Sequence, residues 1–190
     1  MCSLSPYHDT ISVIIGESGE IMDEKIAEFR DGIFALRTRR FGTVAELMIQ
    51  KLICASAGIN QFHDLYDEAN NKKIEVKFST VMKANESTIT KTNLIDQCAK
   101  ATVSKRAMQS NEFNLYGFDC NIQQIKRKEF DILYYGLFFA DKIAIFMIRS
   151  ENILNCLGYS DFQHKGNEGE GQFHLNQQTI NYHFDNHFLQ

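Results

Sequence analysis

The chain has 190 residues, of which 44% are hydrophobic and 12% aromatic, and its formal net charge is −4. This length predicts one domain, residues 1–190, with a substantial core, and the acidic balance argues against strong unaided binding to nucleic acid. No apolar run is long enough to cross a membrane and no signal-peptide pattern is visible. The five scattered cysteines are typical of reduced thiols, so we expect a cytoplasmic protein without a membrane partner.

Charge is distributed unevenly along the chain. Between Lys72 and Asp131 there are eleven Lys and Arg against seven Asp and Glu, so the middle is basic and the ends are acidic. Contacts to phosphate are therefore expected from the middle.

Two helices are predicted in the first third of the chain. Apolar residues recur at helical spacing over residues 23–37. A second helix is expected over residues 43–58, ending at Gly58, with Glu46 as the one acid of its first turns.

The periodicity changes to two after residue 61, which predicts a hairpin that turns at Asn70 and Asn71. A helix over residues 93–108 and two buried strands over 130–139 and 142–148 should follow. Three glycines between residues 166 and 171 suggest a loop in a less regular tail. The order of elements predicts an α/β fold, with a central mixed β-sheet flanked by helices on both faces.

Three charged residues of the hairpin can share one face. Residues two apart in a strand point to the same side, so Glu75 and Lys77 project together, about 7 Å apart, while Ile74 and Val76 enter the core. Asp64, on the preceding strand, can lie beside Glu75. Two carboxylates at one point favour a cation between them, and hard oxygen ligands suit Mg²⁺.

Asp64, followed eleven residues later by Glu75-Val76-Lys77 and preceded by a helix with Glu46, resembles the PD-(D/E)XK nucleases of the restriction-endonuclease-like fold. The runs EFDILYYGLFFADKIAIFMI and FQHKGNEGEGQFHLN resemble later parts of type II restriction endonucleases. The short chain is similar to the small catalytic subunits of heterodimeric type IIS enzymes. The resemblance covers about residues 40–180, and the proline of the motif is replaced by His63.

The resemblance implies a Mg²⁺-dependent endonuclease that hydrolyses phosphodiester bonds of double-stranded DNA, with Mn²⁺ able to replace Mg²⁺. Asp64 and Glu75 would bind the metal, with the Val76 carbonyl completing its coordination. Lys77 would position the attacking water, and Glu46 would contact a second metal or a metal-bound water. A larger DNA-recognition subunit or a second copy of the chain would bring it to DNA.

Several alternatives stay open. Asp67 competes with Asp64 for the metal, but should lie near the hairpin tip. The charges can also be a solvated cross-strand pair, in which case the chain would be a non-catalytic assembly subunit of a DNA complex. A repair or junction-resolving nuclease would use the same fold.

The histidines offer two weaker candidate sites. His183 and His187 have the i, i+4 spacing of zinc pairs but no third ligand at an obvious spacing. His164, Asn167 and His174 could belong to a His-Asn-His nuclease, although the intervening glycines do not resemble that unit.

Overall fold

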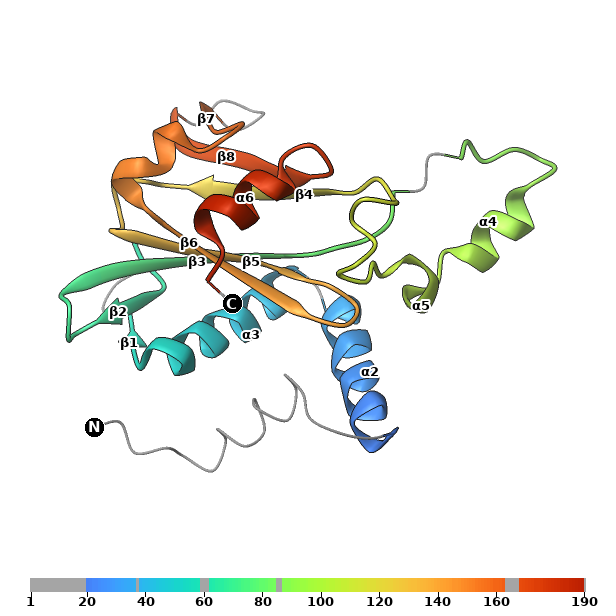
Figure 1. Cartoon of the computed structure of the whole chain (residues 1–190), viewed down its shortest axis with the longest axis horizontal. Helices are drawn as coiled ribbons and strands as arrows, with labels where there is room; N and C mark the ends of the chain where they lie inside the picture. Colours follow the sequence, from blue (N-terminus) through green and yellow to red (C-terminus); the bar gives the residue numbers. More distant parts are fainter. Residues whose placement is uncertain (1–19, 37, 59–61, 85–86, 163–167, 190) are drawn as a thin grey trace.

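The computed structural model describes residues 20–36, 38–58, 62–84, 87–162 and 168–189 (Figure 1). Its elements are α2 (Glu20–Ala35), α3 (Thr38–Ile53), β1 (Ser56–Ala57), β2 (Leu65–Asp67), β3 (Lys72–Thr80), α4 (Leu94–Lys100), α5 (Val103–Arg106), β4 (Asp119–Ile125), β5 (Ile132–Phe138), β6 (Ile143–Arg149), the 3₁₀ helix η1 (Ser150–Asn155), β7 (Ser160–Phe162), β8 (Glu168–Asn176) and α6 (Ile180–His187).

The central sheet has five strands in the order β1-β2-β3-β5-β6. β3 and β5 run parallel, whereas the other neighbouring pairs are antiparallel, so the predicted α/β class with a mixed sheet is confirmed. The long apolar runs form β5 and β6, as predicted. Tyr135 of β5 packs toward one core and Phe138 toward the other, which is why the sequence of this strand does not alternate.

Helix α3 lies along one face of this sheet, and α2 lies beside one end of α3 and extends away from the strands (Figure 1). Ile33 of α2 and Ala45 and Ile49 of α3 are buried against Ile74 and Val76 of β3. α3 begins at Thr38, five residues before the predicted start, and the chain continues as helix through Gly42.

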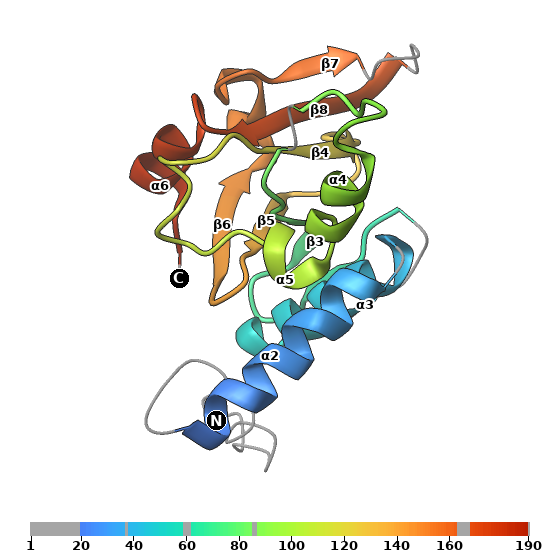
Figure 2. The same cartoon turned by 90° about the vertical axis from the view of Figure 1, so that its right-hand side faces the viewer.

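The opposite face matches the prediction of helices on both faces only in part. A three-stranded sheet, β4-β8-β7, packs there together with α6 (Figure 2). Ile122 of β4 and Phe173 of β8 are buried against Leu133 and Phe146 of the central sheet. Gly169 and Gly171 of the predicted glycine loop lie instead in the strand Glu168–Asn176, where Gly171 packs closely against the Tyr159 ring, and Gly166 lies outside the described residues.

Two helix ends were predicted too far along the chain. α3 stops at Ile53 because Cys54 adopts a left-handed backbone conformation (φ 54°), and Ser56 and Ala57 then pair with β2. The predicted helix 93–108 is broken between Lys100 and Val103 into α4 and α5. Gln97 is the one buried residue of α4, and a short helix without a packed apolar face is marginal.

The predicted hairpin is present as β2 and β3. Leu65 pairs with Ile74 and Asp67 with Lys72, and Asn71 takes the left-handed conformation (φ 54°) that the turn requires. No helix in the described part of the chain has the length and apolar character needed to cross a bilayer.

Candidate active site

Strand β3 places Glu75 and Lys77 on the face of the sheet away from α3. Ile74, Val76 and Phe78 belong to the core under α3, so the alternate residues point to the other side. The Glu75 side chain is 13% exposed and that of Lys77 26% exposed. Both charged groups are therefore mostly buried but remain accessible to solvent.

Asp64 is held at the same place by its own backbone and by its carboxylate. Its N–H donates to the Ile74 carbonyl at 3.0 Å, and its Oδ2 accepts the Val76 N–H at 2.8 Å. Gly58 donates its N–H to the Asp64 carbonyl at 2.9 Å, and a Cβ at Gly58 would overlap the His63 carbonyl oxygen. The glycine thus permits the close backbone approach that positions Asp64.

Lys77 joins the two carboxylates. Its Nζ forms an ion pair with Glu75 and lies 3.8 Å from Oδ2 of Asp64. The structure therefore brings Asp64, Glu75 and Lys77 together, as the spacing in the sequence predicts.

The Val76 carbonyl lies at the same edge. In a strand, the N–H and C=O of one residue point to the same neighbour. Because the Val76 N–H points to Asp64, its carbonyl also points toward the Asp64 side of β3. Two carboxylates and one carbonyl thus form a set of hard oxygen donors.

Burial raises the pKa of Glu75 to about 7, more than the neighbouring Lys77 ammonium lowers it, and the negative charges of Asp64 and Glu129 add to the increase. Although burial disfavours its charged form, the pKa of Lys77 is raised, because Glu75, Asp64 and Glu46 all stabilise the ammonium. Lys77 therefore stays a cation, whereas Glu75 exchanges a proton near neutral pH.

Glu46 of α3 is influenced by the charges of this cluster. Burial, followed by the charge of Asp64, raises the pKa of Glu46, and the charge of Lys77 lowers it. The half-buried carboxylate is thus electrostatically coupled to two of the hairpin residues, from a different element.

Asp67 is engaged elsewhere. Its Oδ1 accepts the Asn70 N–H at 3.2 Å and its Oδ2 accepts the Asn70 side-chain N–H at 2.7 Å. Asp67 therefore closes the hairpin turn, where it pairs with Lys72 at the tip of the hairpin.

Sequence reasoning missed Glu129, whose charge acts on Glu75. It lies in the connection from β4 to β5, at the end of the run Lys126–Lys128. An acid that follows three basic residues looks like an ordinary surface residue, and only the parallel pairing of β3 with β5 brings it near Glu75.

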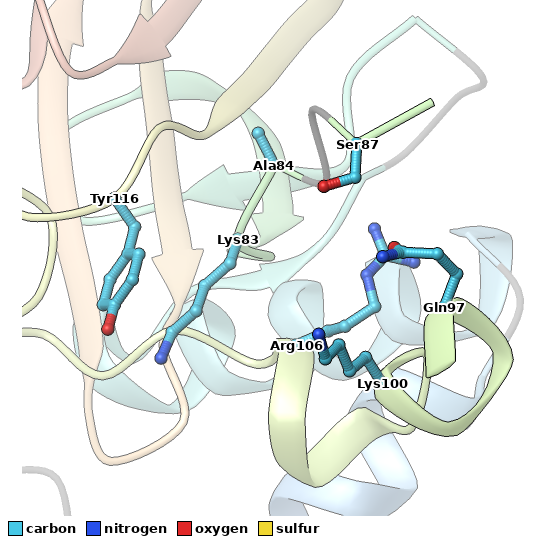
Figure 3. Close-up of a pocket in the computed structure, with 7 residues that line it drawn as sticks. All are labelled: Lys83, Ala84, Ser87, Gln97, Lys100, Arg106 and Tyr116. Carbon is cyan, nitrogen blue, oxygen red and sulfur yellow. The ribbon is translucent and has the colours of Figure 1, made fainter. Parts of the chain in front are cut away.

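A basic pocket of about 220 Å³ opens where the chain leaves β3 (Figure 3). Its lining residues are Lys83, Ala84, Ser87, Gln97, Lys100, Arg106 and Tyr116. Lys83 pairs with Glu112 at 2.8 Å and lies 4.3 Å from the centre of the Tyr116 ring. Lys100 and Arg106 come from α4 and α5, so the pocket gathers cations from three parts of the predicted basic region.

The His-Asn-His hypothesis receives no support from the described residues. His174 lies on β8, where its Nδ1 is 2.8 Å from Oδ1 of Asp119. His164 and Asn167 lie outside the described residues.

A scan against protein-family models gave no match, and a search of curated proteins gave none either.

Proposed function

We propose that the chain is a divalent-metal-dependent endonuclease of the type II or IIS restriction class, which hydrolyses phosphodiester bonds of double-stranded DNA. The observation that supports this best is the cluster of Asp64, Glu75 and Lys77, with Lys77 Nζ 3.8 Å from the Asp64 carboxylate. A carboxylate pair with an ammonium beside it on a partly exposed strand is costly in a purely structural role.

The donor set fits Mg²⁺ or Mn²⁺. Asp64, Glu75 and the Val76 carbonyl offer oxygen atoms only, as these cations prefer. Burial is the main cause of the raised pKa of Glu75, the charge of Asp64 adds to it, and a bound cation would offset that repulsion. Once bound there, the ion would act as a Lewis acid on the phosphate and activate a water molecule.

Lys77 and Glu46 would then have different roles in the reaction. Lys77 stays protonated next to the carboxylates and can donate hydrogen bonds to the attacking water or to a phosphate oxygen, where negative charge develops. Glu46, with its raised pKa, can accept a hydrogen bond or proton from that water or bind a second metal.

The pattern of the central elements supports the proposal. A hairpin, β2-β3, continues into a parallel β3-β5 pair, and α3 packs on β3. The second sheet on the other face is an addition to that pattern.

DNA contact would come from the basic pocket together with a partner. Lys83 follows Lys77 by six residues, which corresponds to about 20 Å of extended chain. The pocket can therefore bind one part of the DNA backbone while the phosphate to be cleaved lies at the carboxylates. A net charge of −4 leaves DNA affinity low. The exposed Leu94 and Ile95 on α4 offer a surface for a larger recognition subunit or a second copy.

The test is cleavage of supercoiled plasmid with Mg²⁺, by the protein alone and with a candidate recognition subunit. We expect nicking or linearisation by wild type and none by Glu75→Ala. Full activity of Glu75→Ala would overturn the assignment. A wild type that never cuts but binds DNA with its partner would instead favour the assembly-subunit alternative, and preference for branched DNA would indicate a junction-resolving or repair nuclease.

A further inference from the structure

A second cluster of potential ligands lies at the C-terminal helix, apart from the carboxylates. Cys156 directly follows η1, and His183 and His187 lie one turn apart on α6. One ligand atom from each of the three residues lies within 4.8 Å of the other two. The cysteine supplies the third ligand that the spacing of the two histidines does not reveal.

The cluster is buried and its imidazoles are incompletely paired. His183 is 0% exposed and Cys156 5% exposed, while His187 is partly exposed. The Nε2 atoms of both histidines are buried without a hydrogen-bond partner in the described part of the chain. Buried polar atoms usually have a partner, so these two nitrogens are candidates for binding a ligand.

The other ring nitrogen of His183 already has a hydrogen-bond partner. Its Nδ1 lies 2.8 Å from the hydroxyl of the fully buried Tyr135. If Nδ1 carries the proton and donates to this hydroxyl oxygen, Nε2 keeps its lone pair. A partner on the second nitrogen is what orients histidines that bind metals.

Packing fixes the ring as well. The His183 ring stacks on Phe173 with centres 5.3 Å apart, and the rings of Tyr135 and Phe146 meet it edge-on. The ligand is therefore held by the core and does not depend on an exposed loop.

We propose that Cys156, His183 and His187 bind a zinc-type transition-metal ion through Sγ and the two Nε2 atoms. One sulfur and two imidazole nitrogens are the donors that select Zn²⁺ over Mg²⁺ or Ca²⁺. Three protein ligands would leave a fourth coordination position for water or another ligand. The ion ties α6 and the end of η1 to β5 through Tyr135, and does not involve the oxygen donors at Asp64 and Glu75.

The experiment uses the full chain, stripped with chelator and titrated with Co²⁺ and, separately, with Zn²⁺ in competition with a chromogenic chelator. Wild type should bind one Zn²⁺ per chain, and Co²⁺ should give the near-ultraviolet charge-transfer absorption of a thiolate ligand. Cys156→Ser should lose this absorption, and His187→Asn should weaken Zn²⁺ binding at least 100-fold. Tyr135→Phe keeps the ring and should weaken binding about tenfold.

Matched controls separate the ligands from other residues of the same type. Cys98→Ser and His174→Asn change an exposed free cysteine and a histidine on β8, and should bind Zn²⁺ like wild type. Asp64→Asn should also bind Zn²⁺ like wild type, so the test of this metal site does not depend on nuclease activity.

Absence of the thiolate absorption in wild type would overturn the proposal, as would equal Zn²⁺ affinity in wild type and His187→Asn. The Co²⁺ absorption spectrum of wild type tests the proposal even if Cys156→Ser fails to fold. Circular dichroism of each metal-free variant shows whether a loss of binding is local.

Discussion

The Nζ of Lys77 lies 3.8 Å from Oδ2 of Asp64, on the far side of a hairpin turn, and the same ammonium forms an ion pair with Glu75. One cation therefore serves two carboxylates. A metal ion that binds these carboxylates would keep Lys77 beside it, in the position from which an ammonium can act on water or phosphate.

Lys77→Ala should reduce plasmid cleavage at least about 100-fold, because a donor aimed at developing charge is lost. We also expect a loss of about 1–2 kcal/mol in the free energy of unfolding at pH 8, since the carboxylates lose their cation while staying partly hydrated. Initial cleavage rates and urea unfolding measure the two effects. Lys73→Ala, at the exposed start of the same strand, is the control, and an equal loss of cleavage there would contradict the assigned role.

Asp64→Asn and Asp67→Asn should separate the two candidate metal ligands. Asp64→Asn should abolish site-specific Mn²⁺ binding in calorimetry. Asp67→Asn weakens the bonds to Asn70, so it should cost about 1 kcal/mol of stability but leave Mn²⁺ affinity unchanged. The reverse pattern would assign the metal to Asp67.

Metal binding should depend on pH through Glu75. Its pKa of about 7 means that the carboxyl must release a proton before it binds a cation. We expect the apparent Mn²⁺ affinity to rise about tenfold between pH 6 and pH 8, as calorimetry would show. A flat profile over this range would contradict the role of Glu75.

Stability of the metal-free protein should change in the opposite direction. The pKa of Glu75 is raised from 4.5 by folding, so the folded state binds the extra proton. The stabilising contribution is complete below about pH 4.5 and is lost as pH rises through 7, by up to about 3 kcal/mol. Urea unfolding of Glu75→Gln and wild type separates this carboxyl group from other titrating residues. The difference in the free energy of unfolding between the two proteins should vary with pH only between about 4.5 and 7.

The basic pocket should contribute to DNA affinity without contributing to chemistry. Lys100→Ala and Arg106→Ala should each weaken binding and reduce the slope of log K against log salt by about 1. Binding is measured with catalytically inactive Glu75→Ala as the background. Lys142→Ala, on the exposed β5-β6 turn, provides the control. Unchanged slopes in both pocket variants would remove this surface from the DNA interface.

Gly58→Ala should impair cleavage through the position of Asp64. The added Cβ would overlap the His63 carbonyl oxygen and would displace the backbone that holds Asp64. We expect the cleavage rate to fall at least tenfold. Excess Mn²⁺ should partly restore it, because the substitution lowers metal affinity and leaves the catalytic side chains chemically unchanged. Gly42→Ala, which meets open space, should cleave normally.

The period-two pattern of residues 62–79 and its asparagine turn determined the hairpin, and with it the shared face of Asp64, Glu75 and Lys77, because neighbours along strands are fixed by local geometry. The long apolar strands β5 and β6 were also readable, since both their faces are buried.

Only the tertiary structure decided what covers the second face of the sheet and which distant groups meet. β4 has exposed polar residues between its buried ones, and its place in the second sheet is set by its pairing with β8. Glu129 reaches Glu75 through the parallel β3-β5 pair. Cys156 meets His183 and His187 because η1 and α6 pack on the same core, and no local spacing records a contact between segments 27 residues apart.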